Sequence, residues 1–188
     1  MIATYTKWIE SKFSHFNIFI SLYEVYYKRI VVKELKLADI KNSDRILCIG
    51  GGSIPCTALA LASQTNAKIH VIDMDNDAVK SARHLVKKLG LSNQISITKD
   101  KGEEIDISSY NVIHIALQVT PKEEVLKHIW NQSKKGNKIL VRLPKKILKP
   151  FYSNISKDFT NRYASYIKSC SLRYRINTID KILLMVKN

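Results

Sequence analysis

Apolar and polar residues alternate in blocks from residue 44 onward, and each block has the period of a strand or of a helix. The expected strands are short and apolar on both faces, whereas the expected helices repeat their apolar residues every three or four positions. The predicted strands are 44–49, 68–72, 94–98, 110–116 and 138–143, and the predicted helices are 55–64, 76–89 and 121–132. This order predicts an α/β fold, with a Rossmann-like, mostly parallel sheet and helices on both of its faces.

The start of the chain has a different pattern. Residues 3–40 carry apolar and aromatic side chains at helical spacing and are expected to form two helices. These helices precede the first strand, so we expect them to form an N-terminal helical cap over residues 1–42. The chain has 188 residues, which is enough for one full core, so residues 43–188 are expected to form one compact unit.

The end of the chain is expected to close the sheet. Residues 147–163, which follow Pro144, are predicted to form one more helix. Two apolar segments, 166–174 and 181–186, are predicted to be closing strands and are consistent with an antiparallel edge strand.

The most informative stretch is Arg45-Ile-Leu-Cys-Ile-Gly-Gly-Gly-Ser-Ile-Pro-Cys-Thr57, where an apolar strand runs into a glycine-rich turn and then into a helix. The glycines Gly50, Gly51 and Gly52 permit a sharp bend and a close approach of the backbone to a ligand. The next strand ends in Asp73, a position from which a carboxylate can accept hydrogen bonds from ribose hydroxyls. Together these features predict a site for a nucleoside cofactor.

The residues around the turn narrow the choice of cofactor. A dinucleotide site needs a third glycine where this chain has Pro55, and no Gly-Lys-Ser or Gly-Lys-Thr follows the turn to hold a triphosphate. S-adenosylmethionine fits what remains, with its ribose on Asp73 and its amino-acid portion against the glycine turn. Asp75 is the alternative to Asp73 for the ribose, because loop registers are uncertain by a few residues.

Two further residues are expected at the same edge of the sheet. Asp100 follows the third strand and is expected to face the adenine amino group, although an aspartate in a plain turn is the alternative. Gln118 lies just past the fourth strand, where acceptors bind in this architecture. His114, in the middle of that strand, is expected to be a core histidine with a hydrogen-bond partner.

Several motifs resemble those of class I S-adenosylmethionine-dependent methyltransferases, and they span residues 44–143. They are Ile46–Gly52, Val71–Asp75, Thr98–Asp100, Tyr110–Ala116 and Lys135–Arg142. Within that superfamily, Gly50-Gly-Gly-Ser-Ile-Pro-Cys-Thr57 and Ala116-Leu-Gln-Val-Thr-Pro-Lys-Glu-Glu124 are similar to segments of nicotianamine synthases. The resemblance implies the same cofactor, from which nicotianamine synthases transfer the aminocarboxypropyl group rather than the methyl group.

The chain departs from methyltransferases at Cys48, where they usually have Asp or Glu, and at Ile54, where they have glycine. Nicotianamine synthases tolerate both changes. They also place a glutamate and tyrosines at their pocket from a helical region ahead of the sheet. That resemblance makes Glu24, with Tyr23 and Tyr27, the candidate base or ammonium clamp, while a tyrosine stripe buried in the core is the alternative.

The formal net charge of +15 raises a nucleic-acid partner as an alternative, but the lysines are scattered and favour a solvated basic surface. The sequence after the fourth strand, Ala116-Leu-Gln-Val119, also lacks the Pro-Pro-aromatic pattern of enzymes that methylate adenine in nucleic acids. Three cysteines without a Cys-x-x-Cys pair indicate reduced thiols and no metal site. No signal peptide or membrane span is apparent, so a cytoplasmic protein is expected.

The expected function is S-adenosylmethionine-dependent transfer to a small-molecule acceptor, with methyl transfer as the default because most of the superfamily performs it. The alternative is transfer of the aminocarboxypropyl group to an amine or amino acid, as in nicotianamine synthases. A third hypothesis is a non-catalytic protein that binds the cofactor or RNA.

Overall fold

The computed structural model describes residues 17–172 and 178–188, with side chains described from residue 26 onward. The second of the two predicted N-terminal helices is α2 (Asn17–Ala38), and the first falls largely outside the described residues. None of the described helices combines the length and the apolar character that crossing a membrane requires.

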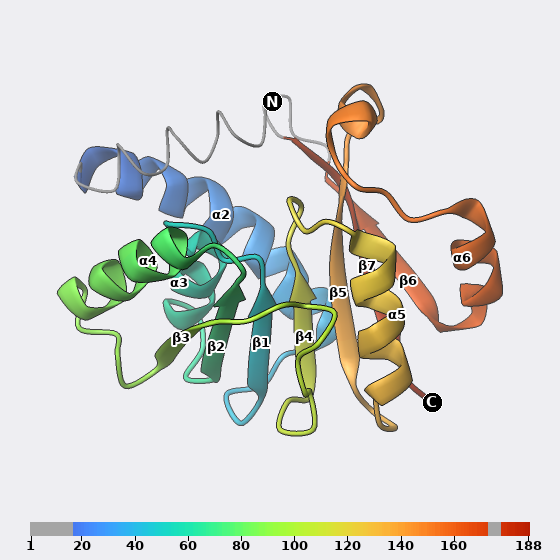
Figure 1. Ribbon diagram of the computed structural model, residues 1–188, viewed down its shortest axis with the longest axis horizontal. Helices are drawn as coiled ribbons and strands as arrows, with labels where there is room; N and C mark the ends of the chain where they lie inside the picture. The colour runs from blue at the N-terminus through green and yellow to red at the C-terminus, as the bar shows by residue number, and fades with distance from the viewer. Residues whose placement is uncertain (1–16, 173–177) are drawn as a thin grey trace.

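A seven-stranded sheet forms the centre of the molecule, with the strand order β3-β2-β1-β4-β5-β7-β6 (Figure 1). Neighbouring strands from β3 to β5 pair in parallel, and β7 pairs antiparallel with both β5 and β6. The strands are β1 (Arg45–Ile49), β2 (Lys68–Asp73), β3 (Ile95–Lys99), β4 (Val112–Ile115), β5 (Lys138–Pro144), β6 (Ile167–Ser171) and β7 (Ile179–Val186). This architecture confirms the predicted fold class.

Helices cover both faces of the sheet, because successive residues of each central strand point to opposite sides and both sides are apolar. Ile46 and Cys48 of β1 pack with α3 (Cys56–Ala62) and α4 (Asn76–Lys88). Leu47 and Ile49 pack on the other face with α5 (Lys122–Gln132). Helix α2 lies on the same side as α3 and α4 (Figure 1) and packs against β5 and β7.

The single helix predicted for residues 147–163 is wrong. The structure has a short 3-10 helix, η1 (Lys146–Phe151), then an extended segment and α6 (Lys157–Arg162), followed by η2 (Ala164–Tyr166). Pro150 has no N–H to continue a helix. The extended segment is instead tied to the start of α5, because Ser153 Oγ accepts a hydrogen bond from Lys122 N–H and Ser156 N–H donates to Glu123 Oε2, both at 2.9 Å.

Helix α4 begins with a carboxylate cap. Asp75 Oδ1 accepts hydrogen bonds from the backbone N–H groups of Asp77 at 3.0 Å and Ala78 at 3.3 Å. Free N–H groups at a helix start need such partners, and the negative charge also complements the helix dipole. The cap fixes the direction in which α4 leaves the end of β2.

Asp75→Ala is therefore expected to lower the free energy of unfolding by about 1 kcal/mol, as removal of a helix cap does. Urea denaturation followed by circular dichroism measures this change. Asp77→Ala is the matched control, since its exposed carboxylate pairs with Lys80 at the surface and, among the described residues, accepts no hydrogen bond from the N–H groups at the helix start. Equal losses in the two variants would contradict the capping role.

Candidate active site

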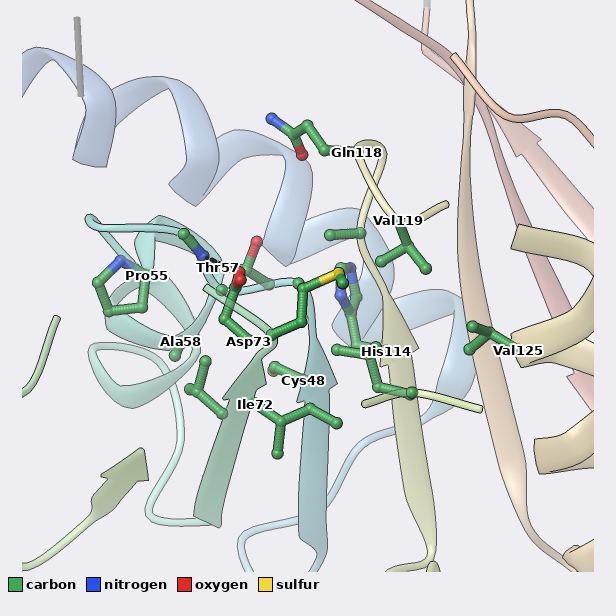
Figure 2. A pocket seen from close by; sticks show the side chains of 18 of the residues that line it. Cys48, Pro55, Thr57, Ala58, Ile72, Asp73, His114, Gln118, Val119 and Val125 are labelled. Carbon is green, nitrogen blue, oxygen red and sulfur yellow. Dashed lines mark hydrogen bonds between the residues drawn. The ribbon is translucent and has the colours of Figure 1, made fainter. Parts of the chain in front are cut away.

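The site lies beside β1, where the order of the strands in the sheet reverses. From β1, the strands β2 and β3 are added toward one edge of the sheet, and β4 and β5 are then added toward the other. The loops leaving adjacent strands separate at such a point and leave a crevice at the carboxyl ends. A cavity of about 320 Å³ occupies this place (Figure 2). It is lined by residues from β1, β2 and β4, by the loops that follow β1 to β4, and by residues of α2, α3, α5 and β5. Its volume is at the lower end of the range for small-molecule sites, which is roughly 300–1,000 Å³.

Most of the predicted site residues meet at this cavity, although they come from separate parts of the chain. Those that line it are Tyr27, Gly50, Gly51, Gly52, Asp73, Asp100 and Gln118. The predicted residues Tyr23 and Glu24 belong to α2, but their side chains lie outside the described part of the chain. Whether they reach the acceptor therefore stays a prediction.

The glycine turn is held between β2 and the loop after β4. Gly50 and Gly52 have φ angles of 84° and 65°, in the left-handed region that glycine adopts without strain. The N–H groups of Gly50 and Gly51 donate to Ile72 O at 2.9 and 3.2 Å. A side chain at Gly50 would come within 2.7 Å of Val119 Cγ2, so only glycine allows this close approach.

Gly51 permits an equally close contact with β2, because a Cβ atom at this position would overlap the Cγ1 methyl group of Val71. We expect Gly51→Ala to destabilise the fold by about 1–3 kcal/mol, the usual cost of overpacking. The double variant Gly51→Ala with Val71→Ala removes the overlapping methyl group and should be more stable than Gly51→Ala alone. Urea denaturation of the two variants makes the comparison, and a double variant less stable than the single one would contradict the steric explanation.

Asp73 links the glycine turn to the loop after β2 and still has acceptor capacity. Its Oδ2 accepts from Gly52 N–H at 2.8 Å, and its Oδ1 accepts from Asp75 N–H at 3.0 Å. A carboxylate offers about four lone-pair sites, so about two remain on this half-buried group. They lie at the cavity, where the two neighbouring hydroxyls of a ribose can donate to them.

Asp75, the alternative to Asp73, does not line the cavity. Its Oδ1 caps α4, as described above, which directs the carboxylate toward that helix. Asp100 lines the cavity and is positioned by its N–H, which donates to Asp73 O at 3.1 Å, while its Oδ1 accepts from Lys101 N–H at 2.8 Å. Gln118 is exposed at the rim of the cavity (Figure 2).

Beside the glycine turn lies a buried polar cluster that the sequence did not predict. Arg142 of β5 donates to Glu34 of α2 through Nε at 2.7 Å and Nη2 at 2.8 Å, and it donates to Thr57 Oγ1 through Nη1 at 2.8 Å. His114 Nε2 of β4 lies 3.2 Å from Glu34 Oε1. Arg142 also stacks over Tyr27, with its Cζ 5.2 Å from the ring centroid.

This cluster holds α2 against the sheet and forms one wall of the cavity. Glu34, His114 and Arg142 are at most 2% exposed, and His114, Arg142, Thr57 and Tyr27 line the cavity, whereas Glu34 does not. The prediction that His114 is a buried histidine with a hydrogen-bond partner is confirmed. No local sequence pattern indicates that Glu34 pairs with Arg142, because the two residues are 108 positions apart.

Burial and charge set the protonation of these groups. Burial opposes ionisation of Glu34, but Arg142 and His114 outweigh it and lower the pKa of Glu34 to about 2. The pKa of His114 is lowered, chiefly by burial and further by Arg142 and Lys122, while Glu34 opposes the shift. Burial raises the pKa of Cys48, which also lines the cavity, to about 12 and keeps it a neutral thiol.

The fold and the site define a protein of the class I S-adenosylmethionine-dependent methyltransferase fold. Within this class, residues 3–170 match the family described as nicotianamine synthase protein, and the chain belongs to that family.

The chain is also similar to proteins named L-histidine 2-aminobutanoyltransferase. The one from Yersinia pestis is 28% identical over 120 residues, which cover 64% of this chain and 45% of the relative. One from Pseudomonas aeruginosa is 31% identical over 111 residues, which cover 58% of this chain and 42% of the relative. The chain thus spans less than half the length of these curated relatives.

Solved structures confirm the fold. A mutant of MtNAS in complex with S-adenosylmethionine has a TM-score of 0.70 at 18% identity, covering 85% of this chain and 61% of that one. An RNA methyltransferase from Salinibacter ruber in complex with S-adenosyl-L-homocysteine has a TM-score of 0.62 at 18% identity, covering 84% of this chain and 90% of that one. At this identity the likeness establishes the fold alone.

Proposed function

We propose that the protein uses S-adenosylmethionine to transfer an aminocarboxypropyl group to the amine of a small acceptor, with an amino acid such as L-histidine as the first candidate. The observation that carries the proposal is the match of residues 3–170 to the nicotianamine synthase family. The names of the curated relatives support the same reaction and suggest the acceptor. Methyl transfer, the default expectation from the superfamily, has no comparable support and becomes the second candidate.

The residues at the cavity fit this cofactor. The two remaining lone-pair sites of Asp73 suit the ribose, and Asp100, which also lines the cavity, would meet the adenine amino group. The turn from Gly50 to Gly52 would hold the amino-acid portion. When bound, S-adenosylmethionine supplies an activated carbon next to its sulfonium, so the protein's main task is to position the acceptor amine and take its proton.

The acceptor is expected on the side of the cavity formed by Gln118, Tyr27 and the end of β4. Tyr23 and Glu24 remain proposed members of this side, because they precede Tyr27 in α2 by about one turn. Residues 1–42 are proposed to act as the cap that separates the acceptor from solvent.

Product analysis tests the proposed reaction. The purified chain is incubated with S-adenosylmethionine and, in turn, L-histidine, other amino acids and simple amines, and the nucleoside products are separated by chromatography. Methylthioadenosine, together with an acceptor heavier by one aminocarboxypropyl group, is the expected result. Formation of S-adenosylhomocysteine and a methylated acceptor would instead show that the reaction is methyl transfer. Tight binding of the cofactor without any turnover would favour the non-catalytic hypothesis.

A further inference from the structure

His114 has two different surroundings, one on each side of its ring. On one side, Nε2 lies 3.2 Å from Glu34 Oε1. On the other side, the residue lines the cavity although it is only 2% exposed (Figure 2). Glu34 does not line the cavity, so Nε2 points away from it.

The ion pair with Arg142 fixes the tautomer of His114. Arg142 holds Glu34 as a carboxylate by donating to both of its oxygens, and a carboxylate can only accept hydrogen bonds. The proton of the neutral His114 ring must therefore be on Nε2, which leaves a lone pair on Nδ1. Among the described residues, no group donates a hydrogen bond to Nδ1. A buried acceptor without a partner at a cavity wall is suited to a ligand donor.

We propose that His114 is the catalytic base that takes the proton from the acceptor amine through Nδ1, with Glu34 and Arg142 as the residues that orient its ring. This inference rests on the proposed transferase function. A proton passes from the acceptor ammonium to Nδ1, and the freed lone pair on nitrogen forms a bond to the aminocarboxypropyl carbon. The electrons of the broken carbon–sulfur bond stay on sulfur in methylthioadenosine, and the imidazolium later returns its proton to solvent.

The charges around the ring suit this task. Burial, Arg142 of β5 and Lys122 of α5 lower the pKa of His114, so that the ring is unprotonated at neutral pH and ready to accept a proton. Once a proton arrives, the carboxylate of Glu34 in α2 stabilises the imidazolium through the existing contact. Cys48 of β1, the residue beside His114 in the neighbouring strand, remains a neutral thiol.

Two other ionisable groups close to His114, the side chains of Glu34 and Lys122, are already occupied. Glu34 has a pKa of about 2 and both oxygens bonded to Arg142, so it is a poor base. Lys122 is fully buried, and its Nζ donates to Ala116 O at 2.6 Å and Leu117 O at 3.1 Å. Its role is to hold the loop after β4 rather than to meet the acceptor.

His114→Gln tests the proposal, because a glutamine amide can still donate to Glu34 but cannot act as a base. With L-histidine as acceptor, kcat at neutral pH is expected to fall about 10²- to 10⁴-fold. The loss should shrink as the pH rises toward the pKa of the acceptor amine, because the variant then depends on amine that is already unprotonated. Affinity for S-adenosylmethionine, measured by calorimetry, should not change. The control is His84→Gln on the exposed side of α4, which should leave kcat unchanged.

A loss that is the same at every pH, or no loss at all, would overturn the catalytic role of His114. A measurement independent of turnover is the ¹⁵N spectrum of the full chain, in which the His114 resonances are identified by their absence in His114→Gln. Nδ1 should have the chemical shift of an unprotonated nitrogen and should move when L-histidine is added. A protonated Nδ1 would overturn the inference even in an active enzyme. If the wild type forms no methylthioadenosine with any amine, the proposed function fails, and the spectrum still tests the tautomer.

Discussion

Glu34→Gln is expected to lower the free energy of unfolding by about 3–5 kcal/mol, because it leaves the guanidinium of Arg142 buried without a countercharge. Arg142 is 2% exposed and donates two of its hydrogen bonds to Glu34, so the variant removes the carboxylate that balances a buried charge. Urea denaturation measures the change. The matched control is Glu104→Gln, which breaks an exposed ion pair with Lys101 and should cost less than about 1 kcal/mol.

The double variant Glu34→Leu with Arg142→Met distinguishes two causes of this loss of stability. One is the cost of burying an unpaired charge, and the other is the contribution of the intact ion pair to the free energy of unfolding. Apolar replacement of both partners should restore most of the stability that Glu34→Gln loses, because no buried charge remains. A double variant no more stable than Glu34→Gln would show that the pair itself, rather than an unpaired charge, accounts for the loss.

The pH dependence of stability follows from the same carboxylate. The pKa of Glu34 falls from 4.5 to about 2 on folding, so the unfolded chain binds the proton more readily. Its contribution is therefore fully present above about pH 4.5 and is lost as the pH falls toward about 2. Wild-type stability should decline in this window more steeply than that of the variant Glu34→Leu with Arg142→Met.

Asp73→Ala is expected to weaken binding of S-adenosylmethionine by about 1–3 kcal/mol, the cost of leaving buried hydroxyl groups without an acceptor. Calorimetry with S-adenosylmethionine and methylthioadenosine measures this loss, and both ligands should be affected because both carry the ribose. Asp75→Ala is the informative control, since it should reduce stability through α4 but leave affinity nearly unchanged. The opposite result, with affinity lost only in Asp75→Ala, would move the ribose contact to Asp75.

Much of the fold was predictable because each central strand is apolar on both faces and each helix that follows has its own apolar stripe. The glycine turn and Asp73 were also predictable, since a glycine turn and the acid about twenty residues later occupy fixed places in this kind of unit. The helix predicted for residues 147–163 failed because Pro150 has no N–H to continue a helix and because the extended segment after it bonds to α5 through the Ser153 hydroxyl and the Ser156 N–H. Helical spacing alone cannot reveal such contacts.

The buried cluster shows the other limit of sequence analysis. Glu34 lies between Lys33 and Leu35, whereas Arg142 lies among apolar residues, and nothing nearby in the sequence indicates that each is the other's partner. The lone pair on His114 Nδ1 could not be foreseen either, because the tautomer depends on that long-range ion pair. Local patterns thus located the glycine turn and the acidic residues that line the cavity, whereas the wall around His114 depends on contacts between distant segments.

The position of β7 has a consequence for how the chain is synthesised and folded. Within the described part of the chain, β6 is the edge strand of the sheet and pairs with β7 alone, which follows it in the sequence and inserts between it and β5. While the chain emerges from the ribosome, the parallel strands can assemble first, but β6 has no pairing partner until Ile179–Val186 has been made. Completion of the sheet is therefore expected to be a late step of folding, during which the exposed edge of β5 needs protection from wrong pairing.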